Sequence, residues 1–99
     1  MTKQPPNAFL LFVSASVAAS CSIPLVIRGS WFSWENGQQT LTEMNADTMT
    51  GRGRCVSMLE EYHVNYTFIF QDDKCYHCVK LIVRTVNVLE KIESKPKNF

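Results

Sequence analysis

Hydrophobic and polar residues alternate in two neighbouring stretches of the second half of the chain. In Val64–Gln71 every second side chain is apolar, and the polar Asn65 and Thr67 fall between them. Cys75–Thr85 repeats the pattern, with one face made of His77, Val79, Leu81 and Val83. A period of two is typical of a β-strand with one face toward a core. We therefore predict two strands, joined by a turn over Gln71–Lys74.

A hairpin is predicted earlier in the chain. Arg28–Glu35 is rich in aromatic residues, and Gln38–Met44 carries Leu and Thr. Asn36-Gly37 lies between them. Both residues tolerate the positive φ that a two-residue hairpin turn requires.

Two further segments complete the expected sheet. Arg54–Tyr62 follows a turn at Thr50–Gly53, and Val86–Ile92 follows the second alternating stretch. Five to six short strands predict an all-β fold, a small antiparallel meander or barrel. We expect this domain to span residues 21–92 and the polar tail at 93–99 to fray.

The first twenty residues are typical of a signal peptide. Lys3 supplies a positive charge, and Ala8–Ala19 is apolar but too short to span a bilayer. Cleavage after Ser20 would place small residues, Ala18 and Ser20, at the −3 and −1 positions that a signal peptidase recognises. The chain is thus expected to be a secreted or cell-surface-associated extracellular protein, with no stable membrane span after cleavage of the signal-peptide helix.

Two other interpretations of this segment remain open. In the first interpretation the segment is a buried N-terminal helix, although Pro5-Pro6 and Ile23-Pro24 disfavour a continuing helix. Alternatively, Ala18–Cys21 loosely resembles a bacterial lipobox, in which Cys21 would be lipidated.

Size and charge limit the classes of function. The chain has 99 residues and a net charge of +1, which indicates one nearly neutral domain. Nucleic-acid binding normally depends on neutralising phosphates with basic residues, so we expect no nucleic-acid partner. Removing the first 20 of the 99 residues leaves 79. A chain of that size usually needs covalent staples, and it is too short for us to expect a barrel with an enclosed ligand cavity.

The four cysteines are the expected staples. Cys21, Cys55, Cys75 and Cys78 all follow the predicted cleavage point, and an even count in an exported chain indicates two disulfides of unknown pairing. Cys75-Tyr76-His77-Cys78 also has the spacing of a redox dithiol or of half a zinc site. No second Cys pair and no βαβ pattern accompany it. We therefore predict no metal and no cofactor.

Other candidate sites are few. Asn65-Tyr66-Thr67 is an N-glycosylation acceptor, and Asn65 is expected to be exposed. Gly29-x-Trp31 resembles the motif that closes one end of lipocalin-type barrels. Trp31 is nevertheless expected to be a core residue, with Trp34 or Phe32 on the opposite face.

Taken in order along the chain, several short motifs resemble a known family. They are Cys21-x-x-Pro24, Gly29-x-Trp31-Phe32, Gly53-x-Cys55 and Cys75-x-x-Cys78. This order resembles an invertebrate, mainly arthropod, family of secreted cysteine-rich extracellular domains of unknown function, although Ile23 stands where that family tends to have Phe. The resemblance covers nearly all of residues 21–87. It implies secretion and disulfides and supplies no catalytic residues.

The sequence contains no convergent catalytic set, so we expect a protein that is not an enzyme. The first hypothesis is an extracellular binding or structural module that contacts another protein, as yet unknown. One alternative is a lipocalin-like carrier of a small apolar ligand. The second alternative is a thiol–disulfide redox protein that uses Cys75 and Cys78.

Overall fold

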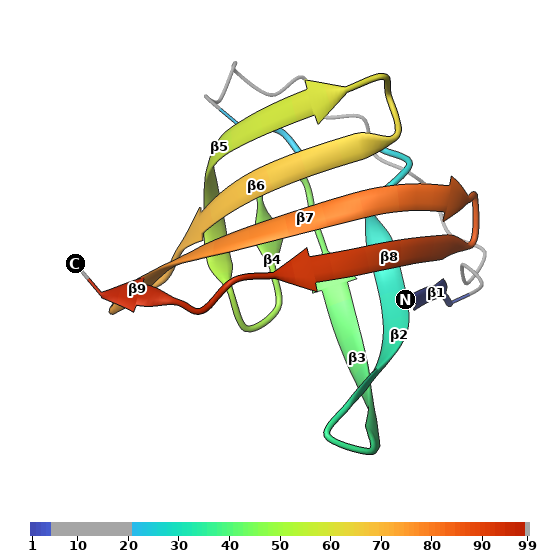
Figure 1. Ribbon diagram of the computed structural model, residues 1–99, viewed down its shortest axis with the longest axis horizontal. Coiled ribbons are helices and arrows are strands. Elements are labelled where there is room, and N and C mark those ends of the chain that lie inside the picture. Colours follow the sequence, from blue (N-terminus) through green and yellow to red (C-terminus); the bar gives the residue numbers. More distant parts are fainter. Residues whose placement is uncertain (5–20, 99) are drawn as a thin grey trace.

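The computed structural model describes residues 1–4 and 21–98, and within these ranges the protein is all-β with no helix (Figure 1). The strands are β1 (Thr2–Lys3), β2 (Gly29–Glu35), β3 (Gln38–Met44), β4 (Thr48–Met49), β5 (Gly53–Glu61), β6 (Asn65–Gln71), β7 (Cys75–Thr85), β8 (Val88–Glu93) and β9 (Lys97–Asn98). The described part of the chain contains no helix long and apolar enough to cross a membrane.

Eight of the strands close into an antiparallel barrel. The order is β6-β5-β4-β3-β2-β1-β8-β7, and β7 pairs again with β6 to complete the ring. Among the described strands β9 pairs with β7 alone, outside the ring. The predicted all-β antiparallel class is therefore confirmed, but the predicted count of five to six strands is wrong. The three additional strands, β1, β4 and β9, have two residues each, too few to show an alternating pattern.

The long strands lie close to their predicted positions. Asn36 and Gly37 have φ values of 53° and 77° and join β2 to β3 as the expected hairpin, with Glu35 opposite Gln38. β6 and β7 pair along their length from Asn65↔Ile82 to Gln71↔Tyr76. β5 carries a bulge between Cys55 and Ser57, where its register with β6 shifts. The tail expected to fray instead adds β9 to β7.

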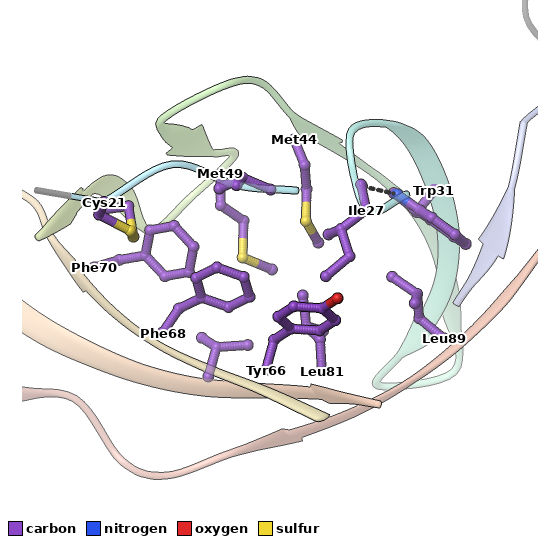
Figure 2. Close-up of a cluster of buried hydrophobic side chains, with 13 residues drawn as sticks. Cys21, Ile27, Trp31, Met44, Met49, Tyr66, Phe68, Phe70, Leu81 and Leu89 are labelled. Carbon is purple, nitrogen blue, oxygen red and sulfur yellow. Dashed lines mark hydrogen bonds between the residues drawn. A yellow bond between two sulfur atoms is a disulfide. The ribbon is translucent and has the colours of Figure 1, made fainter. Parts of the chain in front are cut away.

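Buried apolar side chains fill the barrel interior (Figure 2). They are Cys21, Ile23, Ile27, Trp31, Met44, Met49, Cys55, Tyr66, Phe68, Phe70, Val79, Leu81 and Leu89. Three of them come from residues 21–28, which form no strand. Phe68 stacks between Tyr66 and Phe70, with ring centroids 6.2 Å and 5.5 Å away. The Trp31 indole N–H donates a hydrogen bond of 2.7 Å to the Ile27 carbonyl, which satisfies its one polar atom inside the core.

The predicted signal-peptide helix cannot be followed here, since residues 5–20 lie outside the described residues. The start of that segment is described, and Thr2–Lys3 form β1 between β2 and β8. Closure of eight strands in so short a chain was not expected. It is feasible because two of the eight barrel strands contribute only two residues each and the interior holds side chains rather than an open space.

Two glycines of one turn give a matched test of this packing. Gly51 and Gly53 both have positive φ, 76° and 97°. A Cβ at Gly53 would lie 2.2 Å from the Gln71 carbonyl oxygen, whereas one at Gly51 would have no neighbour within 4 Å. We expect Gly51→Ala to cost about 1–2 kcal/mol from backbone strain alone. Gly53→Ala should cost roughly 3–5 kcal/mol, because overpacking against β6 adds to the strain.

Urea unfolding of both variants and the wild type would measure the difference. Equal losses for the two variants would show that β5 and β6 do not approach as closely at Gly53 as described.

Candidate functional site

The place where β1 lies between β2 and β8, here called the seam, completes the barrel with very few bonds (Figure 1). Thr2 pairs with Phe32 on one side and Val88 on the other. Met1 exchanges two hydrogen bonds with Leu89: the amine donates at 2.5 Å, and the carbonyl accepts at 2.8 Å. Among the described residues, this short segment occupies the gap between two longer strands.

Side chains of the N-terminal residues alternate between the interior and the surface, as in any strand. Thr2 is exposed, whereas Met1 is partly buried and packs against the core. The Lys3 ammonium lies 5.6 Å from the centre of the Trp31 ring, within the range of a cation–π contact. Burial, with Lys91 nearby, lowers the pKa of the Met1 amine. The seam thus accepts an apolar side chain and, two positions later, a cation.

An apolar row crosses the outer surface at the seam. The strand register places Leu41, Phe32, Thr2 and Val88 side by side on β3, β2, β1 and β8. Leu41 is 45% exposed, and Trp34, two residues beyond Phe32 on the same face, is 74% exposed. An exposed Trp beside other apolar side chains is typical of a binding surface. We call Phe32, Trp34, Leu41 and Val88 the outer row.

The gap between β2 and β8 continues past the end of β1. An open hollow of about 480 Å³ is lined there by residues that include Met1, Trp34 and Glu90. Lys91 of β8 reaches Glu35 of β2 with an ion pair of 2.6 Å. Hydrogen bonding to Lys91, and its charge, lower the pKa of the Glu35 carboxyl. β1 is therefore shorter than the gap that it occupies.

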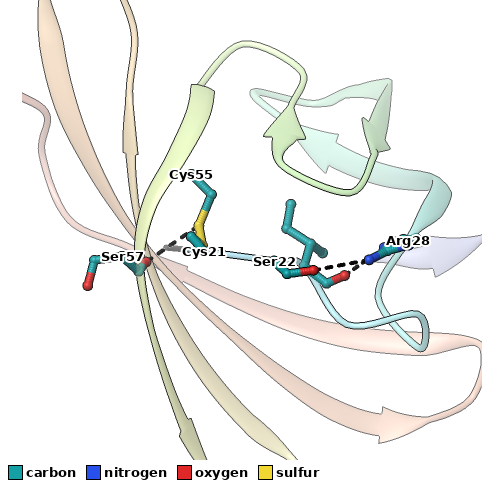
Figure 3. Close-up of a disulfide and its surroundings, with 6 residues drawn as sticks. Cys21, Ser22, Arg28, Cys55 and Ser57 are labelled. Atoms are coloured by element: carbon teal, nitrogen blue, oxygen red, sulfur yellow. Dashed lines mark hydrogen bonds between the residues drawn. A yellow bond between two sulfur atoms is a disulfide. The ribbon is translucent and has the colours of Figure 1, made fainter. Parts of the chain in front are cut away.

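Cys21 and Cys55 form a disulfide that ties the start of the 21–28 segment to β5 (Figure 3). Both are buried, and their Cα atoms are 5.7 Å apart. Arg28, at the other end of the segment, donates to the Ile23 carbonyl at 2.6 Å and to the Ser22 hydroxyl at 3.2 Å, so these bonds fold the segment back on itself. The disulfide and the hydrogen bond of 2.7 Å from the Ile23 N–H to the Ala46 carbonyl attach the segment to the rest of the barrel.

The expected second disulfide is not present, and Cys75 and Cys78 are free. The sequence leaves the pairing open, and in the structure Cys21 and Cys55 bond each other. Three residues of an extended strand span about 10 Å, and a disulfide requires Cα atoms within about 7 Å. Cys75 and Cys78 also lie at positions of opposite parity on β7, so they cannot bond each other without a change in the strand.

The turn before β7 is organised by Asp72. One carboxylate oxygen accepts from the backbone N–H groups of Lys74 and Cys75, each at 2.8 Å, and the other lies 2.8 Å from His77 Nε2. The hydrogen bond to His77, followed by those from the backbone, lowers the pKa of Asp72 far below its usual range. His77 is itself buried, and its Nδ1 has no hydrogen-bond partner within residues 1–4 and 21–98. The sequence predicted this turn but not the pairing with His77.

The remaining predicted residues lie apart from one another. Trp31 is fully buried, whereas Trp34 projects from the outer surface. Asn65 opens β6 and is partly buried rather than exposed, and its buried side-chain oxygen has no hydrogen-bond partner in the described part of the chain. No cluster of three or more His, Cys, Asp or Glu side chains suited to a metal occurs among residues 1–4 and 21–98.

One strained turn had no sequence signal. Tyr62 and His63 have φ values of 56° and 58°, and Val64 donates to the Glu61 carbonyl at 3.2 Å across them. Two consecutive left-handed residues without Gly or Asn each cost roughly 1–2 kcal/mol. The turn presents the exposed Tyr62, while His63 pairs with Glu60 at 2.8 Å.

The disulfide gives a quantitative prediction. Cys21 and Cys55 are 34 residues apart, and closing a loop of that length contributes about 4 kcal/mol in the chain-entropy model. Cys55→Ser should lower the free energy of unfolding by about that amount and reduce the yield of folded protein. The matched variant Cys75→Ser, whose hydroxyl can still bond Asn98, should change it by about 0.5 kcal/mol or less. Equal melting temperatures for the two variants would contradict the assignment.

The Asp72 carboxyl makes the free energy of unfolding depend on pH at acidic pH. Because its pKa is depressed in the folded state, its contribution is complete above the unfolded value of 3.8 and is lost as the pH falls below it. Asp72→Asn should lower the melting temperature at about pH 6, and the gap to the wild type should close toward about pH 2. Thermal unfolding at a series of pH values would measure this. A gap that stays constant with pH would argue against the pairing with His77.

Neither the curated proteins nor the solved structures contain a significant match. One family matches over residues 19–98, a range that contains the disulfide and every strand except β1. That match spans most of the sequence, so the chain belongs to the family described as "Domain of unknown function (DUF7044)".

Proposed function

We propose that this protein is a secreted, disulfide-stabilised binding module that acts through protein–protein contacts at the outer row and has no enzymatic role. The observation that carries the proposal is the row itself. Phe32, Trp34, Leu41 and Val88 expose apolar surface on one side of a barrel whose interior is already filled. Aromatic residues surrounded by polar surface are typical of the energetic centre of an interface.

Two features support export from the cell. The first 20 residues have the composition of a signal peptide, and the family match begins at residue 19, next to the proposed cleavage point. The buried Cys21–Cys55 disulfide is compatible with an oxidising compartment. Asn65 is the proposed glycosylation acceptor. We also propose an arthropod origin, which the motif resemblance implies.

The carrier alternative has less support. A carrier would need Trp31 beside an open interior, but Trp31 is fully buried and bonded to Ile27 among other core side chains. The redox alternative needs two sulfur atoms that can bond each other. The strand geometry of Cys75 and Cys78 separates theirs.

The test combines secretion with site-directed cross-linking. The full chain is expressed in animal cells with a photoreactive phenylalanine analogue at position 41, in the outer row. A matched chain carries it at position 59, where Leu59 of β5 is 61% exposed but lies outside the row. We expect mature protein in the medium and a discrete cross-link to an extracellular protein from position 41 only. Adding Trp34→Ala should reduce that cross-link several-fold, because an exposed Trp is a frequent hot spot.

Intact-mass and peptide analysis of the same material would report the mature N-terminus, the disulfide and any glycan on Asn65. Retention of the chain inside the cell would contradict export. Equal cross-linking from positions 41 and 59, unaffected by Trp34→Ala, would contradict the outer row as the contact surface.

A further inference from the structure

The strand that closes the barrel belongs to the segment proposed to be removed. β1 consists of Thr2–Lys3, whereas its two neighbours, β2 and β8, lie within the family match of residues 19–98. If export removes residues 1–20, the mature domain keeps both walls of the seam and loses the strand between them. This inference therefore rests on the export step of the proposed function.

Loss of β1 removes little from the fold. Cys21, Ile23 and Ile27 stay in the core, because the disulfide to Cys55 holds the new N-terminus in place. Among the described residues of the removed segment, Met1 packs against the core, and it is only partly buried. The remaining seven barrel strands stay connected through β6–β7.

The vacated seam would expose two unpaired strand edges that face each other. The Leu89 N–H would lose its acceptor, the Met1 carbonyl. The Asn87 and Ser30 carbonyls would lose the N–H groups of Lys3 and Gln4, respectively, which donate to them. Facing edges of this kind readily accept an added strand. The hollow of about 480 Å³ beyond Met1 leaves room for a strand longer than β1.

The side chains of the seam define the chemistry of the strand that fits. The Met1 position faces the core, the Thr2 position faces outward, and the Lys3 position places a cation over Trp31. We propose that the mature domain binds an extended segment of a partner protein by strand addition at the seam. The bound segment of the partner carries an apolar residue, followed two positions later by Lys or Arg. The outer row then flanks the bound strand on both sides, through Phe32 of β2 and Val88 of β8.

The test uses protein secreted from animal cells and one defined probe. The probe is an acetylated octapeptide, Val-Thr-Val-Thr-Met-Thr-Lys-Gln, which carries the sequence of residues 1–4 and extends it into the hollow. Amide hydrogen exchange and chemical shifts are followed at Leu89 and Phe32. We expect saturable binding, with slowed exchange of the Leu89 amide.

Two control peptides and one control protein define the contact. Replacing the Lys of the peptide by Glu should weaken binding about 5- to 10-fold, through loss of the contact with Trp31. Methylating the backbone nitrogen of that Lys should abolish binding, because the donor to the Asn87 carbonyl is lost. The uncut full-length chain, refolded with residues 1–4 in place, should not bind the peptide. Tyr62→Ala, on the distant β5–β6 turn, should bind as the unmodified domain does.

Each other outcome overturns the inference, and the outcomes separate it from the proposed function. If the Leu89 amide of the monomeric cleaved domain is protected from hydrogen exchange without peptide, β2 has paired directly with β8. Protection that appears only on dimerisation makes the occupant a second copy of the chain. Both results leave the secreted binding module standing. If the secreted chain keeps Met1, the seam is not vacated, and both this inference and the proposed cleavage are wrong. If the cleaved chain cannot fold without residues 1–4, the inference of a vacated seam is wrong.

Discussion

Closure of a β-sheet on itself is the constraint on which the rest of this structure depends. A barrel has no unpaired edges only if every neighbouring pair of strands, including the last pair, is hydrogen-bonded. Here the long antiparallel pairs β2–β3, β5–β6, β6–β7 and β7–β8 supply most of the ladder. The two-residue strands β1 and β4 supply the closing contacts. Closure is strong around most of the ring and weak at the seam.

A small barrel can keep this shape only with a dense interior and firm attachments at its ends. The aromatic stack of Tyr66, Phe68 and Phe70 fills the interior from β6. The 21–28 segment adds core side chains without forming a strand and is fastened to β5 by the disulfide. At another corner, Arg52 holds Glu93 through two charge-assisted hydrogen bonds, which raise the pKa of the guanidinium. These attachments explain how a short chain maintains eight barrel strands.

The surface features converge on the weakest part of the ring. The outer row, the hollow past Met1 and the cation over Trp31 all lie at the seam between β2 and β8. A filled interior leaves the outside of a barrel for recognition, and a strand edge offers backbone hydrogen bonds that bind largely independently of sequence. Exposed apolar side chains beside such an edge can add the specificity that the backbone lacks. The proposed binding surface and the proposed strand-accepting seam are therefore two parts of one site.

The sequence by itself determined the long strands, because alternation in Val64–Gln71 and Cys75–Thr85 and the Asn36-Gly37 turn are local signals. It also identified the all-β antiparallel class and the importance of the cysteines. Only the tertiary structure decided the number of strands, the pairing of Cys21 with Cys55, the partnership of Asp72 with His77, and the strained turn at Tyr62-His63. The physical reason is range: a period of two can be detected along a long strand, whereas a two-residue strand, a disulfide partner or a barrel closure depends on contacts between residues distant in sequence.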